Sequence, residues 1–362
     1  MKTLTPTAAN RLSLDYADEA FLMPQLPYPI IDVHTHLSGQ RAAEIYKDVA
    51  ERFGIRLTYS MTGPESAPAV KRVLGDAVRF IVTPDFRATD IRHALTDGFR
   101  DRIARLHKLG ARMVKFWAAP RGIDIGENGG DADAMRIDSP YYRDMMQFTQ
   151  DSGLMAMVHL ADPDTWFATK YKDQARYGAK QEHYDRFERV LDRFSMPFIV
   201  AHFGGSPEDL GRLDGLLQRH DNLYLDTSAA KWMIRELSRH PHQQIQSFFT
   251  RWRGRLLFGS DIVVAEAHLS SEGADEEMAS KAASEQDAFD LYASRYWALR
   301  TMYETNYDGE SPIADPDLAM VAPEHHSPMD APRLKGRTLD AATLKSLYHD
   351  AAVELLSPWY ES

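Results

Sequence analysis

The sequence contains no cysteine among its 362 residues. Disulfide scaffolds and thiolate-ligated zinc are therefore excluded, and any bound metal must use His, Asp, Glu or a modified Lys. No stretch approaches the roughly 18 uninterrupted apolar residues of a membrane span, and the first 28 residues lack an apolar segment after a basic start. We therefore expect a soluble, cytoplasmic protein that does not insert into a membrane.

Basic residues are also in the minority. Lys and Arg number 42 against 53 Asp and Glu, which gives a formal net charge of -11, and no run is rich in Lys or Arg. This balance argues against a nucleic acid or an anionic membrane surface as partner. A small-molecule partner is the remaining expectation.

Short apolar runs alternate with amphipathic helical patterns along most of the chain. Buried parallel strands are rich in Val, Ile, Leu, Met and Phe in this way. The alternation predicts an α/β fold, a (β/α)₈ TIM-type barrel with a C-terminal helical extension, and an open doubly wound sheet is the alternative. The predicted strands are 30–37, 54–61, 79–84, 111–117, 154–160, 197–203, 222–228 and 256–262.

We interpret residues 1–362 as a single barrel domain whose core spans about 30–305. A helix is predicted over 285–303, followed by a Pro-rich irregular arm over 307–334 and a closing helix over 340–356. The arm is too long for an ordinary connection. It is predicted to be a cover over the barrel mouth, an interface arm compatible with a homodimer, or a mobile segment.

Polar residues stand at the ends of several predicted strands. His34 and His36 are two residues apart on the first strand and so point to one face. His159 and His202 end the fifth and sixth runs, and Asp261 ends the eighth. Because a barrel brings the carboxyl ends of its strands to one face, these residues are candidates for a metal-dependent active site. Asp261 suits both metal ligation and proton transfer, whereas helix capping is its simpler role.

Further residues near the predicted strand ends would suit an anionic, partly apolar small molecule. Lys115 lies inside the fourth strand and, if buried, needs a partner carboxylate, a substrate anion, or conversion to a carbamate that bridges two metals. The other predicted substrate-binding residues are Trp117, Arg121, Trp166, Trp232 and Arg235.

An ordered set of segments resembles the amidohydrolase superfamily, and within it the amidohydrolase-related group of small-molecule hydrolases, lactonases and decarboxylases of the aminocarboxymuconate-semialdehyde type. The segments are Asp32-Val33-His34-Thr35-His36, Met157-Val158-His159, Ala201-His202-Phe203-Gly204-Gly205, Tyr224-Leu225-Asp226-Thr227-Ser228 and Phe258-Gly259-Ser260-Asp261. The resemblance implies that His34, His36, His159 and Asp261 bind one divalent ion, usually zinc and sometimes manganese. It also implies that His202 contacts the reacting water or the substrate. A second ion bridged by a carboxylated Lys115 is the less favoured alternative.

Two departures from the group bear on the reaction. Many relatives carry Lys-Leu-His-Pro after the fourth strand, where this chain has Lys115-Phe116-Trp117. Several aromatic-acid decarboxylases of the group begin with Glu-x-His, where this chain has His34-Thr35-His36. The expected function is therefore hydrolysis of a small-molecule C-N amide bond or lactone C-O bond. Non-oxidative decarboxylation of an unsaturated or aromatic acid is the alternative, and a non-catalytic binding protein on a degenerate barrel is a third class.

Overall fold

The computed structural model describes residues 6–270 and 281–360. Nine strands are hydrogen-bonded in the order β8-β7-β6-β5-β4-β3-β2-β1-β9, and helices alternate with them along the chain. This is the predicted α/β fold of the TIM-barrel type, with helices after the last strands. All eight predicted runs contain a strand, and the last one is split into two short strands. The bounds are β1 Ile30–Leu37, β2 Ile55–Met61, β3 Val78–Val82, β4 Met113–Trp117, β5 Met155–His159, β6 Phe198–Val200, β7 Leu223–Asp226, β8 Leu256–Leu257 and β9 Ile262–Val264.

The helices of the described residues lie mostly between the strands along the chain. They are α1 Tyr16–Leu22, α2 Gln40–Arg52, α3 Ala67–Leu74, α4 Ile91–Ala94, α5 Asp97–His107, α6 Gly122–Asn128, α7 Pro140–Asp151, α8 Asp164–Phe167, α9 Gln174–Tyr177, α10 Lys180–Arg193, α11 Leu210–Arg219, α12 Ala230–Leu237, α13 His242–Arg251, α15 Glu285–Glu304, α16 Asp317–Val321, α17 Ala341–Lys345 and α18 Ala351–Tyr360. The predicted helix over 285–303 is confirmed as α15. The predicted closing helix over 340–356 extends to Tyr360, and a π-helical turn at Ser346–Asp350 joins α17 to α18 within it. Within the described ranges, no helix combines the length and apolarity needed to cross a membrane.

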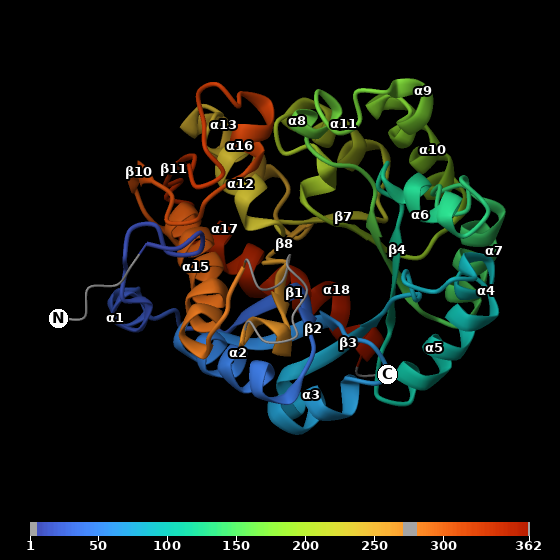
Figure 1. Ribbon diagram of the computed structural model, residues 1–362, viewed down its shortest axis with the longest axis horizontal. Helices are drawn as coiled ribbons and strands as arrows, with labels where there is room; N and C mark the ends of the chain where they lie inside the picture. Colours follow the sequence, from blue (N-terminus) through green and yellow to red (C-terminus); the bar gives the residue numbers. More distant parts are fainter. Residues whose placement is uncertain (1–5, 271–280, 361–362) are drawn as a thin grey trace. The chain divides into compact units, whose positions relative to one another are not determined.

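The chain divides into two compact units, and each is discontinuous in sequence. The first unit comprises residues 1–60, 65–79 and 227–352, and the second comprises 61–64, 80–226 and 353–362. In the first unit, β1 pairs in parallel with β2 on one side and with β9 on the other. Helix α15 lies beside α2 (Figure 1), and the ring of Tyr296 on α15 is 6.1 Å from the ring of Phe53. These contacts pack α15 against α2 and the residue that follows it.

The second unit contains parallel pairs from β3 to β7, and its helices α5, α7 and α10 flank β4 and β5 (Figure 1). Aromatic rings join helices to strands: the Phe116 ring lies 5.8 Å from the Phe99 ring and 5.3 Å from the Tyr142 ring. Phe116 is fully buried. The β4-β5 register places Trp117 opposite His159 at the carboxyl ends of both strands. This register puts two predicted site residues next to each other.

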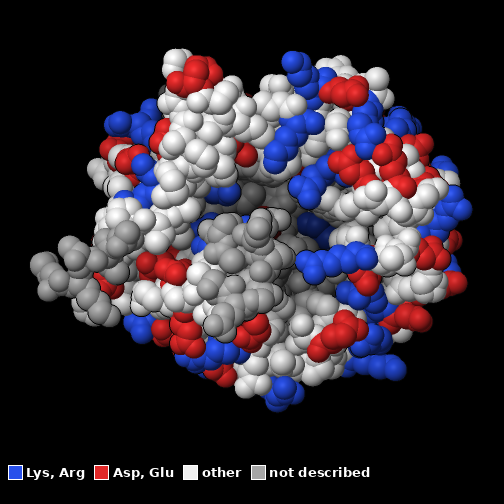
Figure 2. Space-filling model, in the orientation of Figure 1, with Lys and Arg blue, Asp and Glu red and all other residues white. Residues whose placement is uncertain are grey.

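The arm over 307–334 has defined structure in the first unit. Strands β10 Asp308–Glu310 and β11 Arg333–Lys335 form an antiparallel hairpin, and α16 lies between them in sequence. The backbone of Ala314 donates to the carbonyl of Ala8, and Arg11 donates to the carbonyl of Pro312. Figure 2 shows Lys and Arg interspersed with Asp and Glu on the viewed face, as the mixed composition suggests.

Gly205 marks a close backbone contact in the second unit. It has a left-handed φ of +74°, and a Cβ atom built on it would lie 2.1 Å from the carbonyl oxygen of Ala161. Only glycine fits such an approach. The contact joins the loop after β6 to the loop after β5.

We expect Gly205→Ala to lower the free energy of unfolding by at least about 2 kcal/mol more than Gly153→Ala, because overpacking adds to backbone strain. Gly153 is the matched control, since it also has a positive φ of +65° but nothing within 4 Å of a built Cβ. Urea unfolding of both variants measures the difference. Equal losses would mean that the Ala161 contact contributes nothing.

Candidate metal centre

Three predicted ligands converge in the first unit. Asp261 Oδ1 lies 3.4 Å from His34 Nε2 and 3.3 Å from His36 Nε2, and the three ligand atoms lie within 4.8 Å of one another. The His34 side chain is 1% exposed, whereas those of His36 and Asp261 are 38% and 28% exposed. The group is therefore anchored in the core on one side and accessible to solvent on the other.

Asp32 holds this arrangement together, and sequence analysis assigned it no role. Its carboxylate accepts hydrogen bonds from the backbone of His34 at 3.0 Å and of Ser260 at 3.1 Å. It also accepts from the Ser260 hydroxyl at 2.6 Å and from the Tyr296 hydroxyl at 2.8 Å. Burial raises the pKa of Asp32 to about 7, although these hydrogen bonds act in the opposite direction. One fully buried carboxylate thus fixes the backbone beside two candidate ligands, His34 and Asp261.

The support for Asp32 extends through two tyrosines. The Tyr46 hydroxyl lies 2.8 Å from that of Tyr296 and 2.7 Å from the hydroxyl of Thr58. All of these side chains are buried, so each hydroxyl needs such a partner. The chain of hydrogen bonds links α2, α15 and β2 to Asp32 on β1.

Asp261 follows β8 in a left-handed backbone conformation, with φ +59°. Such a conformation costs about 1 kcal/mol or more, although Asp tolerates it better than most residues. The backbone N-H of Asp261 donates to the His34 carbonyl at 2.8 Å, which ties the turn to β1. The turn directs the carboxylate to the two imidazoles.

The donor set of the first unit fits a divalent metal. Two imidazoles and one carboxylate are ligands that zinc and other first-row divalent ions accept, and three protein ligands leave a position open for water or substrate. The identity of the metal does not follow from these residues. Their ligand role stays a prediction, which the convergence of the three atoms supports.

His159 is placed in the second unit with both ring nitrogens engaged. Its Nε2 lies 2.8 Å from Asp162 Oδ1, and its Nδ1 accepts a hydrogen bond from the Trp117 indole at 2.8 Å. Asp162 is 1% exposed and also accepts a hydrogen bond from the Tyr171 hydroxyl. Sequence analysis did not identify Asp162. The signal that could have found it is its position three residues after His159.

His202 and Lys115 are buried residues of the second unit. His202 follows β6 with φ +59°, its backbone N-H donates to Asp226 Oδ1 at 2.9 Å, and its ring lies 4.4 Å from that of His159. Lys115 lies on β4, within the second unit. The catalytic role of His202 and the chemical state of Lys115 stay predictions.

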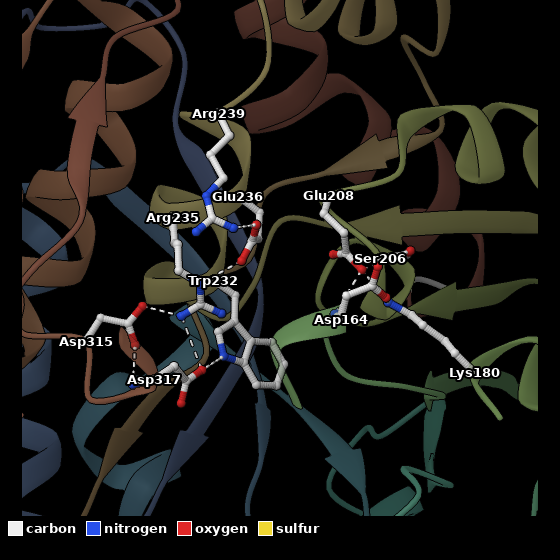
Figure 3. A network of polar contacts seen from close by, with 10 residues as sticks. All are labelled: Asp164, Lys180, Ser206, Glu208, Trp232, Arg235, Glu236, Arg239, Asp315 and Asp317. Atoms are coloured by element: carbon white, nitrogen blue, oxygen red, sulfur yellow. Dashed lines mark hydrogen bonds and ion pairs between the residues drawn. The ribbon is translucent and has the colours of Figure 1, made fainter. Parts of the chain in front are cut away.

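The predicted substrate-binding residues fall into two groups. In the second unit, the Arg121 guanidinium lies 5.4 Å from the Trp117 ring, and the Trp166 ring lies 5.8 Å from that of Tyr171. These side chains gather around His159 and Asp162. Asp164 beside Trp166 pairs with Lys180, which also contacts Glu208 (Figure 3).

Trp232 and Arg235 bind carboxylates inside the first unit. Arg235 is 2% exposed and contacts Asp315, Asp317 and Glu236, while the Trp232 indole donates to Asp317 at 2.9 Å (Figure 3). Burial opposes the charge of Arg235, but the three carboxylates raise its pKa above the usual value. The guanidinium thus binds the arm to α12, a role that sequence analysis did not anticipate.

Comparisons with known proteins find solved structures that resemble the chain at low sequence identity. The chain matches no protein-family model and no curated protein sequence. Among solved structures it resembles a zinc-bound amidohydrolase from Burkholderia multivorans at 13% identity, over 91% of this chain and 99% of that chain, with a TM-score of 0.45. It also resembles HMG-CoA lyase from Bacillus subtilis at 12% identity, over 76% of this chain and 94% of that chain, with a TM-score of 0.39. A third similar structure is 5-methylcytosine deaminase from Klebsiella pneumoniae, at 14% identity over 65% of this chain and 63% of that chain, with a TM-score of 0.36. Likenesses this distant carry no conclusion about the reaction of this chain.

We expect Asp32→Ala to lower the free energy of unfolding by about 3–5 kcal/mol, because four buried donors lose their acceptor. Asp32→Asn keeps one acceptor oxygen and should cost about 1–3 kcal/mol. Asp48→Ala is the control, since Asp48 is an exposed residue of α2 paired with Arg52. Urea unfolding measures all three variants, and an Asp32→Ala protein as stable as Asp48→Ala would contradict the role given to Asp32.

Proposed function

We propose that this chain is a metal-dependent hydrolase of the amidohydrolase superfamily that cleaves a C-N amide bond or a lactone C-O bond of a small molecule. The convergence of His34 and His36 on β1 with Asp261 in the turn between β8 and β9 carries the proposal. The ordered sequence segments that resemble this superfamily support it as well. Zinc is the metal we favour, with manganese as the alternative.

The residues of the first unit would have different roles in the reaction. His34, His36 and Asp261 would hold the ion, and a divalent ion at such a site supplies Lewis acidity that lowers the pKa of water toward neutrality. Asp261 is 28% exposed and has a second carboxylate oxygen, with which it can take a proton from water. Asp32 would keep the ligands in position without contacting the substrate.

An anionic substrate is part of the proposal. Burial lowers the pKa of Arg295 on α15 to about 10, whereas the nearby Tyr16 hydroxyl and Asp261 carboxylate act to raise it. Burial and the nearby Arg295 also lower the pKa of Lys231 on α12. Two cations whose charge burial disfavours would gain from a substrate carboxylate, although Asp315 and Asp317 already favour the charge of Lys231. Neither residue was singled out from the sequence.

We expect His34→Ala, His36→Ala and Asp261→Ala each to reduce bound zinc from one equivalent to about a tenth or less, because a catalytic zinc site uses only three or four protein ligands. His325→Ala is the matched control, since its side chain is 75% exposed in the arm. Metal analysis after dialysis against trace zinc measures the content. Full zinc occupancy in all three variants would contradict the ligand assignment.

A substrate screen tests the reaction itself. Zinc-loaded protein is assayed with small amides, lactones and unsaturated or aromatic carboxylic acids, and each acid is compared with its uncharged methyl ester. We expect acid release without carbon dioxide, a preference for the charged member of each pair, and no turnover by His36→Ala. Carbon dioxide release would favour the decarboxylase alternative and overturn hydrolysis. No turnover of any compound would overturn it too.

A further inference from the structure

Two loops of the second unit meet at two successive points. The loops after β5 and β6 first approach each other at Ala161 and Gly205, where the backbone contact leaves no room for a Cβ atom. Three residues further along each loop, the backbone N-H of Asp164 donates to Glu208 Oε1 at 3.1 Å. The first contact is fixed by backbone packing, whereas the second depends on an ionisable side chain.

The second contact joins two carboxyl groups to one ammonium group. Lys180, at the start of α10, lies 2.8 Å from Asp164 Oδ1 and also contacts Glu208 Oε1 (Figure 3). The Ser206 hydroxyl donates to Glu208 Oε1 at 3.4 Å. The side chains of Lys180 and Glu208 are only 10% and 17% exposed. When both carboxyl groups are ionised, their negative charges outnumber the single positive charge, and water screens this excess poorly.

The other charged or titratable groups that face this cluster are engaged with partners of their own. Arg212 on α11 favours the ionised form of Asp164, but its Nε also lies 3.6 Å from Asp209 Oδ2. The Tyr184 hydroxyl on α10 donates to the Gly204 carbonyl at 2.6 Å. The positive charge of Arg212 is therefore shared between the cluster and Asp209.

Glu208 is the member of the cluster that favours a proton. Its Oε2 atom is buried and has no hydrogen-bond partner within the described part of the chain. Burial raises the pKa of Glu208 to about 6, while Lys180 acts to lower it. Burial also opposes ionisation of Asp164, but hydrogen bonds with Lys180 and Glu208 lower its pKa below the ordinary value. A hydrogen bond between two carboxyl groups requires that one of them carry a proton, and here Glu208 carries it.

We propose that Asp164, Lys180 and Glu208 form a pH-sensitive clasp between the loops after β5 and β6. The clasp is closed when the two carboxyl groups share one proton. It opens when both are ionised, because Lys180 then balances only one of them. Opening releases α8, which carries Trp166, while the contact at Gly205 keeps the bases of the loops together. The clasp does not involve the candidate metal centre, so this inference goes beyond the proposed function.

The direction of the pH dependence follows from the two states of the clasp. In the closed clasp Glu208 keeps its proton up to about pH 6, whereas in the open clasp water surrounds it and its pKa returns to the ordinary 4.5. Raising the pH through this range removes the proton and so favours opening. The two pKa values limit the shift in the opening equilibrium to about 30-fold.

Amide hydrogen exchange measures this opening. The Asp164 N-H, which donates to Glu208 in the closed clasp, should lose about 10- to 30-fold in protection factor between about pH 5 and about pH 7.5. The Phe194 N-H, which donates to the Val190 carbonyl at 3.1 Å, is the internal reference and should keep its protection factor. A protection factor at Asp164 that stays constant or rises with pH would overturn the proposal.

A neutral variant of Glu208 tests whether this residue is the one that titrates. Glu208→Gln keeps the size of the side chain but cannot ionise, so the Asp164 N-H should stay as protected at high pH as in the parent at low pH. Asp185→Asn is the matched control, since Asp185 is an exposed residue of α10 that accepts a hydrogen bond from Gln181. It should follow the parent. A pH response in Glu208→Gln as large as in the parent would contradict the role of Glu208.

Carboxyl ¹³C spectra of the parent protein test the shared proton without relying on a variant that folds. Glu208 should titrate above its ordinary value of 4.5. In Asp164→Asn the Glu208 midpoint should fall, because the repulsion between the two carboxylates is absent. A parent midpoint at or below 4.5, or a midpoint that Asp164→Asn leaves unchanged, would show that the two carboxyl groups do not share a proton.

Discussion

The buried carboxylate of Asp32 joins two chain segments that are 228 residues apart in sequence. It accepts hydrogen bonds from the backbone N-H groups of His34 and Ser260. His34 is itself a candidate ligand on β1, and Ser260 directly precedes the candidate ligand Asp261. Leaving such donors unsatisfied would cost about 1–3 kcal/mol for each group. The convergence of His34, His36 and Asp261 therefore depends on a residue that does not belong to their group.

Arg235 and Asp162 are buried ionisable groups that lie beside acid or base partners. Arg235 neutralises carboxylates from the arm and from its own helix, while Asp162 is matched with His159 and Tyr171. Breaking such a buried pair by removing one partner typically costs about 3–5 kcal/mol. A guanidinium occupied by Asp315 and Asp317 is committed to the fold, and the His159 imidazole has both ring nitrogens engaged, by Asp162 and by Trp117.

Local patterns carried most of the fold prediction. Apolar runs separated by helical periodicity located all eight predicted strands and α15, because burial on both faces of a parallel sheet leaves a clear signature in sequence. Secondary structure was less predictable from the sequence where contacts between distant segments determine it. The split of the last strand into β8 and β9, the π-helical turn after α17 and the hairpin in the arm have no local pattern of comparable strength.

By itself, the sequence determined which residues were available for chemistry: no thiolate, a His-x-His pair on the first strand, and single polar residues at later strand ends. The two-residue period of a strand is sufficient to place His34 and His36 on one face. Only the tertiary structure decided what each polar group faces. Hydrogen bonds between distant segments made Asp32 a support, turned Arg235 inward, and gave His159 the partners Asp162 and Trp117, because such contacts depend on chain packing and not on spacing along the sequence.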